Sequence, residues 1–137
     1  MEIYLDNAAT TKTLPVVNEA MMEVLEQGFG NPSSKHILGV NAEKYIKDAT
    51  NTISKILKCN PKEIVYTSCA TESNNTAIFG SALKRERFGK HLITSQIEHP
   101  SVKEAFLELE NRGFRVTFLP VDSKGKVDIE ALKEALD

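Results

Sequence analysis

The chain of 137 residues lacks tryptophan, and its two cysteines, Cys59 and Cys69, do not form a Cys-x-x-Cys pair. It also lacks any apolar run near the ~20 residues that a membrane-spanning helix needs. Its first residues contain neither the basic segment nor the apolar segment of a secretory signal. These absences predict a cytoplasmic protein with reduced thiols and without a membrane anchor.

An excess of charge of one sign is missing as well. The chain has 17 Lys and Arg against 19 Asp and Glu, for a formal net charge of -2, and 41% of its residues are hydrophobic. Nucleic-acid binding needs clustered basic residues, and the densest basic run, Lys84 to Arg87, contains Glu86. The three histidines and two cysteines do not follow a zinc-site spacing. We expect a globular domain without a nucleic-acid partner or a metal site.

Helical and extended patterns alternate after a polar N-terminal arm that ends near Thr13. The expected helices have apolar residues at helical spacing, and they cover Pro15 to Gly28, about Val40 to Lys58, Glu72 to Arg87, Pro100 to Gly113, and Asp128 to Leu136. The expected strands are short and apolar, and they cover Glu63 to Thr67, His91 to Ser95, and Phe114 to Leu119. This order predicts an α/β fold built from parallel β-α-β units.

The predicted sheet is small. Three expected strands compare with ~5–6 in a typical sheet, and the last expected helix should lead into a further strand. We therefore expect an incomplete, mainly parallel sheet, in a chain that is a fragment, a split subunit or a truncated protein.

A possible anion site lies where the first expected strand meets the next helix, at Ser68-Cys69-Ala70-Thr71. Ligands of open α/β sheets bind beyond the carboxyl ends of the strands, and a helix N-terminus there offers free N–H groups to a phosphate. Ala70 is small enough for an anion to approach the backbone. Thr71 either caps the helix or donates its hydroxyl to the anion. A nucleotide loop is not indicated, because no Gly-x-Gly-x-x-Gly or Walker pattern is present.

A second candidate follows the next strand, in Gln96-Ile97-Glu98-His99-Pro100. It should lie on the same edge of the sheet as the first. His99 would there stack on a planar ring or move protons, or it is an ordinary surface histidine at a helix start. Position alone leaves both interpretations open.

Four motifs in this order resemble the cysteine desulfurases of the NifS/IscS type, in the class V aminotransferase group of fold-type I pyridoxal-phosphate (PLP) enzymes. The motifs are Tyr4-Leu5-Asp6-Asn7-Ala8-Ala9-Thr10-Thr11, Gly30-Asn31-Pro32-Ser33-Ser34-x-His36, Thr67-Ser68-Cys69-Ala70-Thr71-Glu72-Ser73-Asn74-Asn75, and Glu98-His99-x-x-Val102. The resemblance spans the chain but only the early part of the much longer enzymes. It implies the N-terminal part of the PLP-dependent transferase fold, with residues 1–60 contributing to the small domain and 61–137 beginning the PLP-binding large domain.

The resemblance also implies residue roles. Ala70 and Thr71 would bind the PLP phosphate, and His99 would stack on the pyridine ring and is a candidate for acid/base catalysis. Asn7 and its arm would lie near the active-site mouth. Such enzymes convert L-cysteine to L-alanine and keep the sulfur as an enzyme-bound persulfide for iron-sulfur cluster assembly or thiolation. The implied partners are a second copy of the chain and a sulfur acceptor such as an iron-sulfur scaffold protein.

Some features depart from the family pattern. Cys69 stands where the family commonly has glycine, and we do not expect it to be the nucleophile, because a neighbouring phosphate would disfavour its thiolate. The Schiff-base lysine and the nucleophilic cysteine are not recognisable here, since none of Lys12, Lys35 and Lys90 lies in a Ser-x-His-Lys segment. The chain alone should therefore be inactive. The alternatives are another PLP enzyme of this fold, such as a selenocysteine lyase or an aminotransferase, and a non-catalytic interaction fragment.

Overall fold

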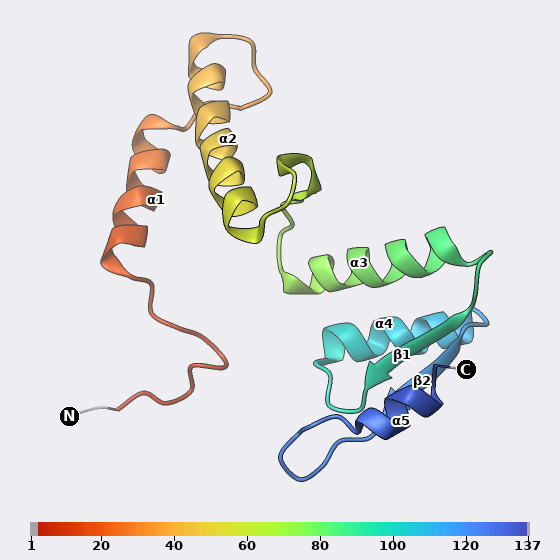
Figure 1. Cartoon of the computed structure of the whole chain (residues 1–137). Helices are drawn as coiled ribbons and strands as arrows, with labels where there is room; N and C mark the ends of the chain where they lie inside the picture. The colour runs from red at the N-terminus through yellow and green to blue at the C-terminus, as the bar shows by residue number, and fades with distance from the viewer. Residues whose placement is uncertain (1–2, 137) are drawn as a thin grey trace. The chain divides into compact units, whose positions relative to one another are not determined.

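Helices form most of the computed structural model, which describes residues 3–136 (Figure 1). The elements are, in chain order, α1 (Pro15–Gln27), α2 (Ile37–Leu57), the 3-10 turn η1 (Pro61–Glu63), α3 (Ala70–Arg85), β1 (His91–Ser95), α4 (Pro100–Asn111), β2 (Arg115–Leu119) and α5 (Ile129–Glu134). They divide into two compact units, Met1–Val65 and Tyr66–Asp137. Every helix expected from the sequence is present, with ends that differ by a few residues.

The first unit contains α1 and α2, which meet through a tyrosine. The hydroxyl of Tyr45 donates a hydrogen bond to Glu23 Oε1 at 3.0 Å, and a Cβ added at Gly28, where α1 ends, would lie 3.0 Å from the Tyr45 ring. Burial in this unit is limited to small residues. The residues of α2 that are buried are Gly39, Ala42 and Ser54, whereas none is buried in α1.

The loop between α1 and α2 packs closely on the start of α2, and two glycines make this possible. A Cβ on Gly30 would collide with the carbonyl oxygen of Leu38, and one on Gly39 would collide with that of Ser34. His36 begins the helix by accepting a hydrogen bond at Nδ1 from the Gly39 N–H, at 3.4 Å. The loop that the sequence predicts around Asn31 is therefore an ordered cap on α2.

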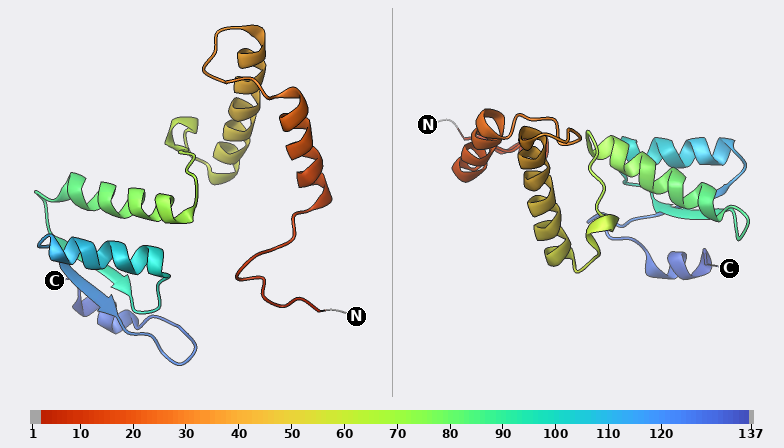
Figure 2. Two further views of the ribbon diagram at one scale, coloured as in Figure 1. Left: turned by 180° about the vertical axis from the view of Figure 1, so that it is seen from behind. Right: turned by 90° about the horizontal axis from the view of Figure 1, so that it is seen from above.

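The second unit contains the parallel β-α-β arrangement that the sequence predicts. β1 and β2 pair in parallel, from His91 with Arg115 to Ser95 with Leu119, and α4 connects them. α3 packs alongside α4 (Figures 1 and 2). The core between these elements consists of Ala82, Leu109 and Phe114, with Ile78, Phe79 and Leu92 packed against it.

The expected strand from Glu63 to Thr67 is wrong. Glu63 belongs to η1, where Asn60 Oδ1 accepts the Lys62 N–H at 2.9 Å and Glu63 Oε2 accepts the Asn60 N–H at 2.7 Å. The next four residues form no strand, and Val65 is 72% exposed. A strand forms only where a neighbouring strand accepts and donates its hydrogen bonds, and the sheet of the described residues contains only β1 and β2.

Candidate functional site

The start of α3 presents backbone N–H groups that the helix does not use. The first intrahelical bond runs from the Ser73 N–H to the Cys69 carbonyl at 3.1 Å, so the N–H groups of Ala70, Thr71 and Glu72 precede it. Cys69 is the N-cap residue, in extended conformation, and its side chain makes no capping hydrogen bond. Ala70 and Thr71 are exposed. The helix start is therefore accessible to an acceptor from solvent.

The prediction that Thr71 caps the helix is wrong. Thr71 lies inside the first turn of α3, and Cys69 occupies the N-cap position. Because Cys69 is the N-cap residue, α3 begins at Ala70, two residues before the point at which it would begin if Thr71 were the N-cap residue. The Thr71 hydroxyl is thus not needed to satisfy the N-cap, which leaves it available as a donor.

The Cys69 thiol indicates how well this helix start stabilises negative charge. The pKa of Cys69 is lowered, chiefly by the backbone N–H of Glu72 and then by the Ser68 hydroxyl, with smaller contributions from the Thr71 backbone and side chain. The Ser68 hydroxyl lies 3.8 Å from the Cys69 sulfur. The same donors would stabilise an anionic oxygen at this position, which is the chemistry that a phosphate site needs.

Glu72 is the acidic group nearest to these donors, and Ser68 binds its carboxylate. Glu72 Oε2 accepts the Ser68 N–H at 2.6 Å and the Ser68 hydroxyl at 2.7 Å. These bonds lower the pKa of Glu72, the hydroxyl more than the backbone N–H. Behind them, the hydroxyls of Thr67 and Ser73 lie 2.6 Å apart. The loop before α3 is therefore fixed by side chains of its own helix.

His99 is the N-cap residue of α4, with an exposed side chain. Its Nδ1 accepts the Ser101 N–H at 3.1 Å and lies 2.9 Å from Ser101 Oγ. α4 follows directly on the carboxyl end of β1. The histidine thus lies at the edge of the sheet where the sequence places it, and its ring is held through one nitrogen.

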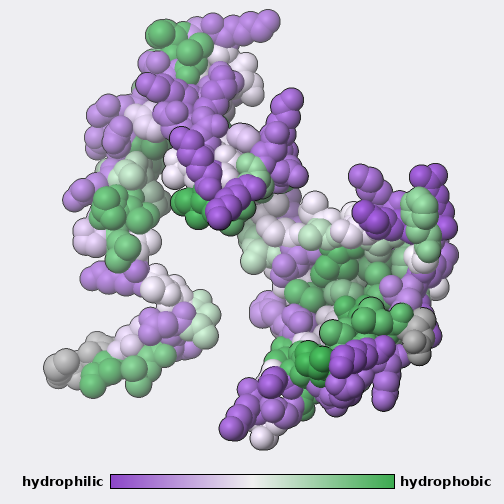
Figure 3. All heavy atoms as spheres, viewed as in Figure 1, coloured by the Kyte–Doolittle hydropathy of each residue, from purple (hydrophilic) through white to green (hydrophobic). Residues whose placement is uncertain are grey.

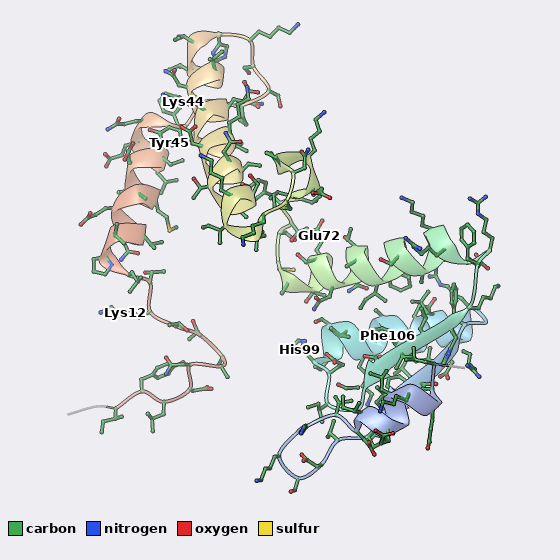
Figure 4. All side chains as sticks on the ribbon, viewed as in Figure 1. Lys12, Lys44, Tyr45, Glu72, His99 and Phe106 are labelled. Carbon is green, nitrogen blue, oxygen red and sulfur yellow. The ribbon has the colours of Figure 1, made fainter. Side chains whose placement is uncertain are left out.

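The structure brings the two candidate sites together in the second unit. Asn74 Nδ2, in the second turn of α3, donates to Ser101 Oγ at 2.9 Å, and Ser101 contacts His99. Glu72 and His99 accordingly lie at the same end of this unit (Figure 4). Sequence reasoning missed this link: Asn74 is part of a quoted motif, but Ser101 occupies a variable position of another and gave no signal. Asn7 belongs to the other unit, and its place at an active-site mouth stays a prediction.

The arrangement fits a phosphorylated planar ligand. Main-chain N–H groups that the helix does not use and a threonine hydroxyl lie at the exposed start of α3, and an imidazole lies at the start of α4. This set supplies donors for an anion and a flat surface for a ring.

No three His, Cys, Asp or Glu side chains among residues 3–136 gather as metal ligands would. No helix there combines the length and the apolar character that crossing a membrane requires.

Comparison with known proteins assigns this arrangement to a family. The family model described as aminotransferase class-V matches residues 3–137. The chain is 51% identical over 135 residues to a NifS/IcsS protein homolog of Lactobacillus delbrueckii subsp. bulgaricus, and 47% identical to the cysteine desulfurase IscS of Dictyoglomus turgidum. Each match covers 98% of this chain but 35% and 34% of the relatives. The chain therefore spans about a third of the length of these proteins.

Solved structures agree with the sequence matches. A NifS-like protein superposes with a TM-score of 0.91 at 39% identity, over 98% of this chain and 37% of that one. A structure described as SspA in complex with cysteine superposes with a TM-score of 0.84 at 41% identity, over 95% of this chain and 38% of that one. The α/β architecture is thus that of the NifS-like fold-type I proteins.

Proposed function

The chain belongs to the aminotransferase class-V family, and from this premise we propose that the protein acts as a PLP-dependent cysteine desulfurase. The reaction would convert L-cysteine to L-alanine and leave the sulfur as an enzyme-bound persulfide. The observation that carries the proposal is the link, within one unit, between the exposed helix start at Ala70 and Thr71 and His99, through Asn74 and Ser101. Two relatives named cysteine desulfurase are 47% and 43% identical to this chain over the matched residues, and a relative with the NifS name is 51% identical.

In this proposal the chain's residues bind and orient the cofactor. The N–H groups of Ala70 and Thr71 and the Thr71 hydroxyl hold the phosphate, where the α3 dipole adds to the attraction. The imidazole of His99 covers one face of the ring. PLP, when bound, supplies an electron sink for the bonds around the substrate's α-carbon. Residues 1–60 would contribute to the small domain and residues 61–137 to the PLP-binding domain.

The covalent chemistry, we propose, comes from residues other than these 137. Lys90 pairs with Glu86 at 2.6 Å, and Lys12 and Lys35 lie in the other unit. None of the three has the Ser-x-His-Lys context of a Schiff-base lysine. Cys69 would face the phosphate, where a second negative charge is unfavourable.

The substrate and partners are part of the proposal too. L-cysteine is supported by the SspA structure, whose description names bound cysteine and whose matched region is 41% identical. A homodimer, a sulfur acceptor such as an iron-sulfur scaffold protein, and a cytoplasmic location follow from the same family likeness.

The phosphate site is tested by Thr71→Ala, with Thr76→Ala as the matched control. Thr76 is an exposed threonine of the same helix, five residues beyond Thr71. Loss of one hydrogen bond to a charged group should weaken PLP binding about tenfold. The preference for PLP over pyridoxal should fall by the same factor, because pyridoxal lacks the phosphate. Equal effects of both variants on that preference would refute the assignment.

The desulfurase activity is tested in a chimera. This chain replaces the matching third of the Dictyoglomus turgidum cysteine desulfurase, and alanine formed from L-cysteine is measured. We expect activity in the chimera, whereas the 137 residues alone should form neither alanine nor a borohydride-trapped PLP adduct. A folded chimera that binds PLP but yields no alanine would contradict the function. Alanine from the 137 residues alone would contradict the assignment of the covalent chemistry.

A further inference from the structure

The polar contacts around Ser101 determine which ring nitrogen of His99 carries the proton. A backbone N–H only donates, and the Ser101 N–H points at His99 Nδ1 from 3.1 Å. Nδ1 must therefore present its lone pair in this arrangement. In the neutral ring the proton then resides on Nε2.

The Ser101 hydroxyl strengthens the same choice, because Asn74 directs it. Asn74 Nδ2 donates to Ser101 Oγ at 2.9 Å, so the hydroxyl oxygen already acts as an acceptor. Its one proton is free to point at His99 Nδ1, which lies 2.9 Å away. Asn74 and Ser101 are half-buried, whereas His99 is exposed, so the two positioning side chains are more shielded from competing water than the ring that they hold.

We propose that Asn74 and Ser101 are positioning residues that hold His99 as the Nε2–H tautomer. His99 therefore offers a hydrogen-bond donor at Nε2, and while the ring is neutral this nitrogen does not accept a hydrogen bond. Its natural partner is an anionic oxygen. The assignment of that oxygen to the bound cofactor or to the substrate rests on the proposed function. The tautomer of His99 does not depend on that function.

The chain offers a matched pair of variants for the test, Asn74→Asp and Asn75→Asp. An Asp at position 74 would accept the Ser101 hydroxyl proton and remove it from His99 Nδ1. Asn75 is the next residue, and its Nδ2 donates instead to the Thr71 carbonyl at 2.8 Å. Both variants add the same charge to the same turn of α3. A difference between them therefore reports the hydrogen bonds from residue 74 through Ser101 to His99, and not the electrostatic effect of the added charge.

The measurement is ¹⁵N NMR of the protein labelled in its three histidines, at a pH where the rings are neutral. We expect His99 to show an unprotonated Nδ1. Asn74→Asp should raise the Nδ1-protonated fraction roughly fivefold, the size of one lost hydrogen bond, and Asn75→Asp should leave it unchanged. A protonated Nδ1 in the unmodified protein, or equal responses to the two variants, would overturn the proposal.

His91 monitors the fold in the same spectra. It lies 2.8 Å from Thr117 Oγ1 and 2.7 Å from Arg115 across the two strands, so its signals move if the second unit unfolds. Should Asn74→Asp unfold it, Ser101→Ala and Ser101→Thr decide: the alanine variant should shift the Nδ1 signal of His99, and the threonine variant, which keeps the hydroxyl, should not. A shift in the threonine variant without a shift in the alanine variant would refute the proposal. PLP binding is measured separately, so loss of the proposed function and loss of the tautomer are distinguishable outcomes.

Discussion

The two units of the chain, Met1–Val65 and Tyr66–Asp137, differ in how their side chains are used. In the second unit, Leu109 is fully buried and Phe114 is 4% exposed, within a core that helices and strands share. In the first unit, α1 buries no residue, and Leu25 is 67% exposed. Hydrophobic side chains lie on the outside of α1 and of the arm before it (Figure 3).

This difference explains why the candidate site lies in the second unit. A site needs side chains whose positions are fixed by neighbours on other elements. In the second unit, the bond from Asn74 to Ser101 joins two helices over a separation of 27 residues. The apolar core beneath these helices fixes their relative position. The first unit offers instead ordered local caps and a hydrogen bond between its helices, from Tyr45 to Glu23.

The sharpest test of this contrast is Leu109→Ala against Leu25→Ala. Removing a fully buried leucine should lower the free energy of unfolding by about 3 kcal/mol, from lost burial and the cavity that remains. Removing the exposed leucine of α1 should change it by less than ~0.5 kcal/mol. Urea denaturation measures the change in the free energy of unfolding for both variants. Hydrogen exchange in α4 and β2 then shows whether the loss in Leu109→Ala lies in the second unit. Comparable losses would mean that α1 is buried in the protein in solution.

The cysteines, one in each unit, give a second test. Cys69 is exposed with a lowered pKa, whereas Cys59 is only half-exposed. Iodoacetamide should therefore modify Cys69 several-fold faster near neutral pH, because the thiolate is the reactive form. PLP should slow that reaction selectively, since its phosphate would compete for the Glu72 and Thr71 donors that lower the pKa of Cys69. Faster labelling of Cys59, read by peptide mass spectrometry, would contradict the exposure and charge assigned to Cys69.

The smallest effect is expected from Tyr45→Phe in the first unit. The pKa of Tyr45 is raised above its ordinary value of 10.0, chiefly by the hydrogen bond to Glu23. A raised pKa stabilises the fold below the ordinary value, and this contribution is lost as the pH rises through the raised one. Spectrophotometric titration should show a tyrosine component that ionises above the ordinary pKa of 10.0, and Tyr45→Phe should remove that component. If the variant still shows that titration component, the component belongs to another tyrosine.

Local signals predicted most elements, because each depends on residues that are near in sequence. Pro15 and Pro100 stand at the first positions of α1 and α4, and Asp128 caps α5 by accepting the Glu130 N–H at 2.9 Å. The failed strand, Glu63 to Thr67, shows the limit of such signals. Its apolar residues suit a strand, but the Asn60 capping box draws Glu63 into η1, and strand formation depends on a neighbour that composition does not reveal.

The sequence by itself determined the helices, the parallel β-α-β unit, and the ordered motifs that identify Ala70, Thr71 and His99 as candidates. Only the tertiary structure decided how these candidates are connected. Cys69, rather than Thr71, occupies the N-cap position of α3, and the chain of contacts from Asn74 through Ser101 to His99 crosses from one helix to another. The apolar pattern that predicts a helix repeats every three or four residues, so it can be read locally. A hydrogen bond between helices instead depends on packing that brings polar atoms of distant residues within about 3 Å.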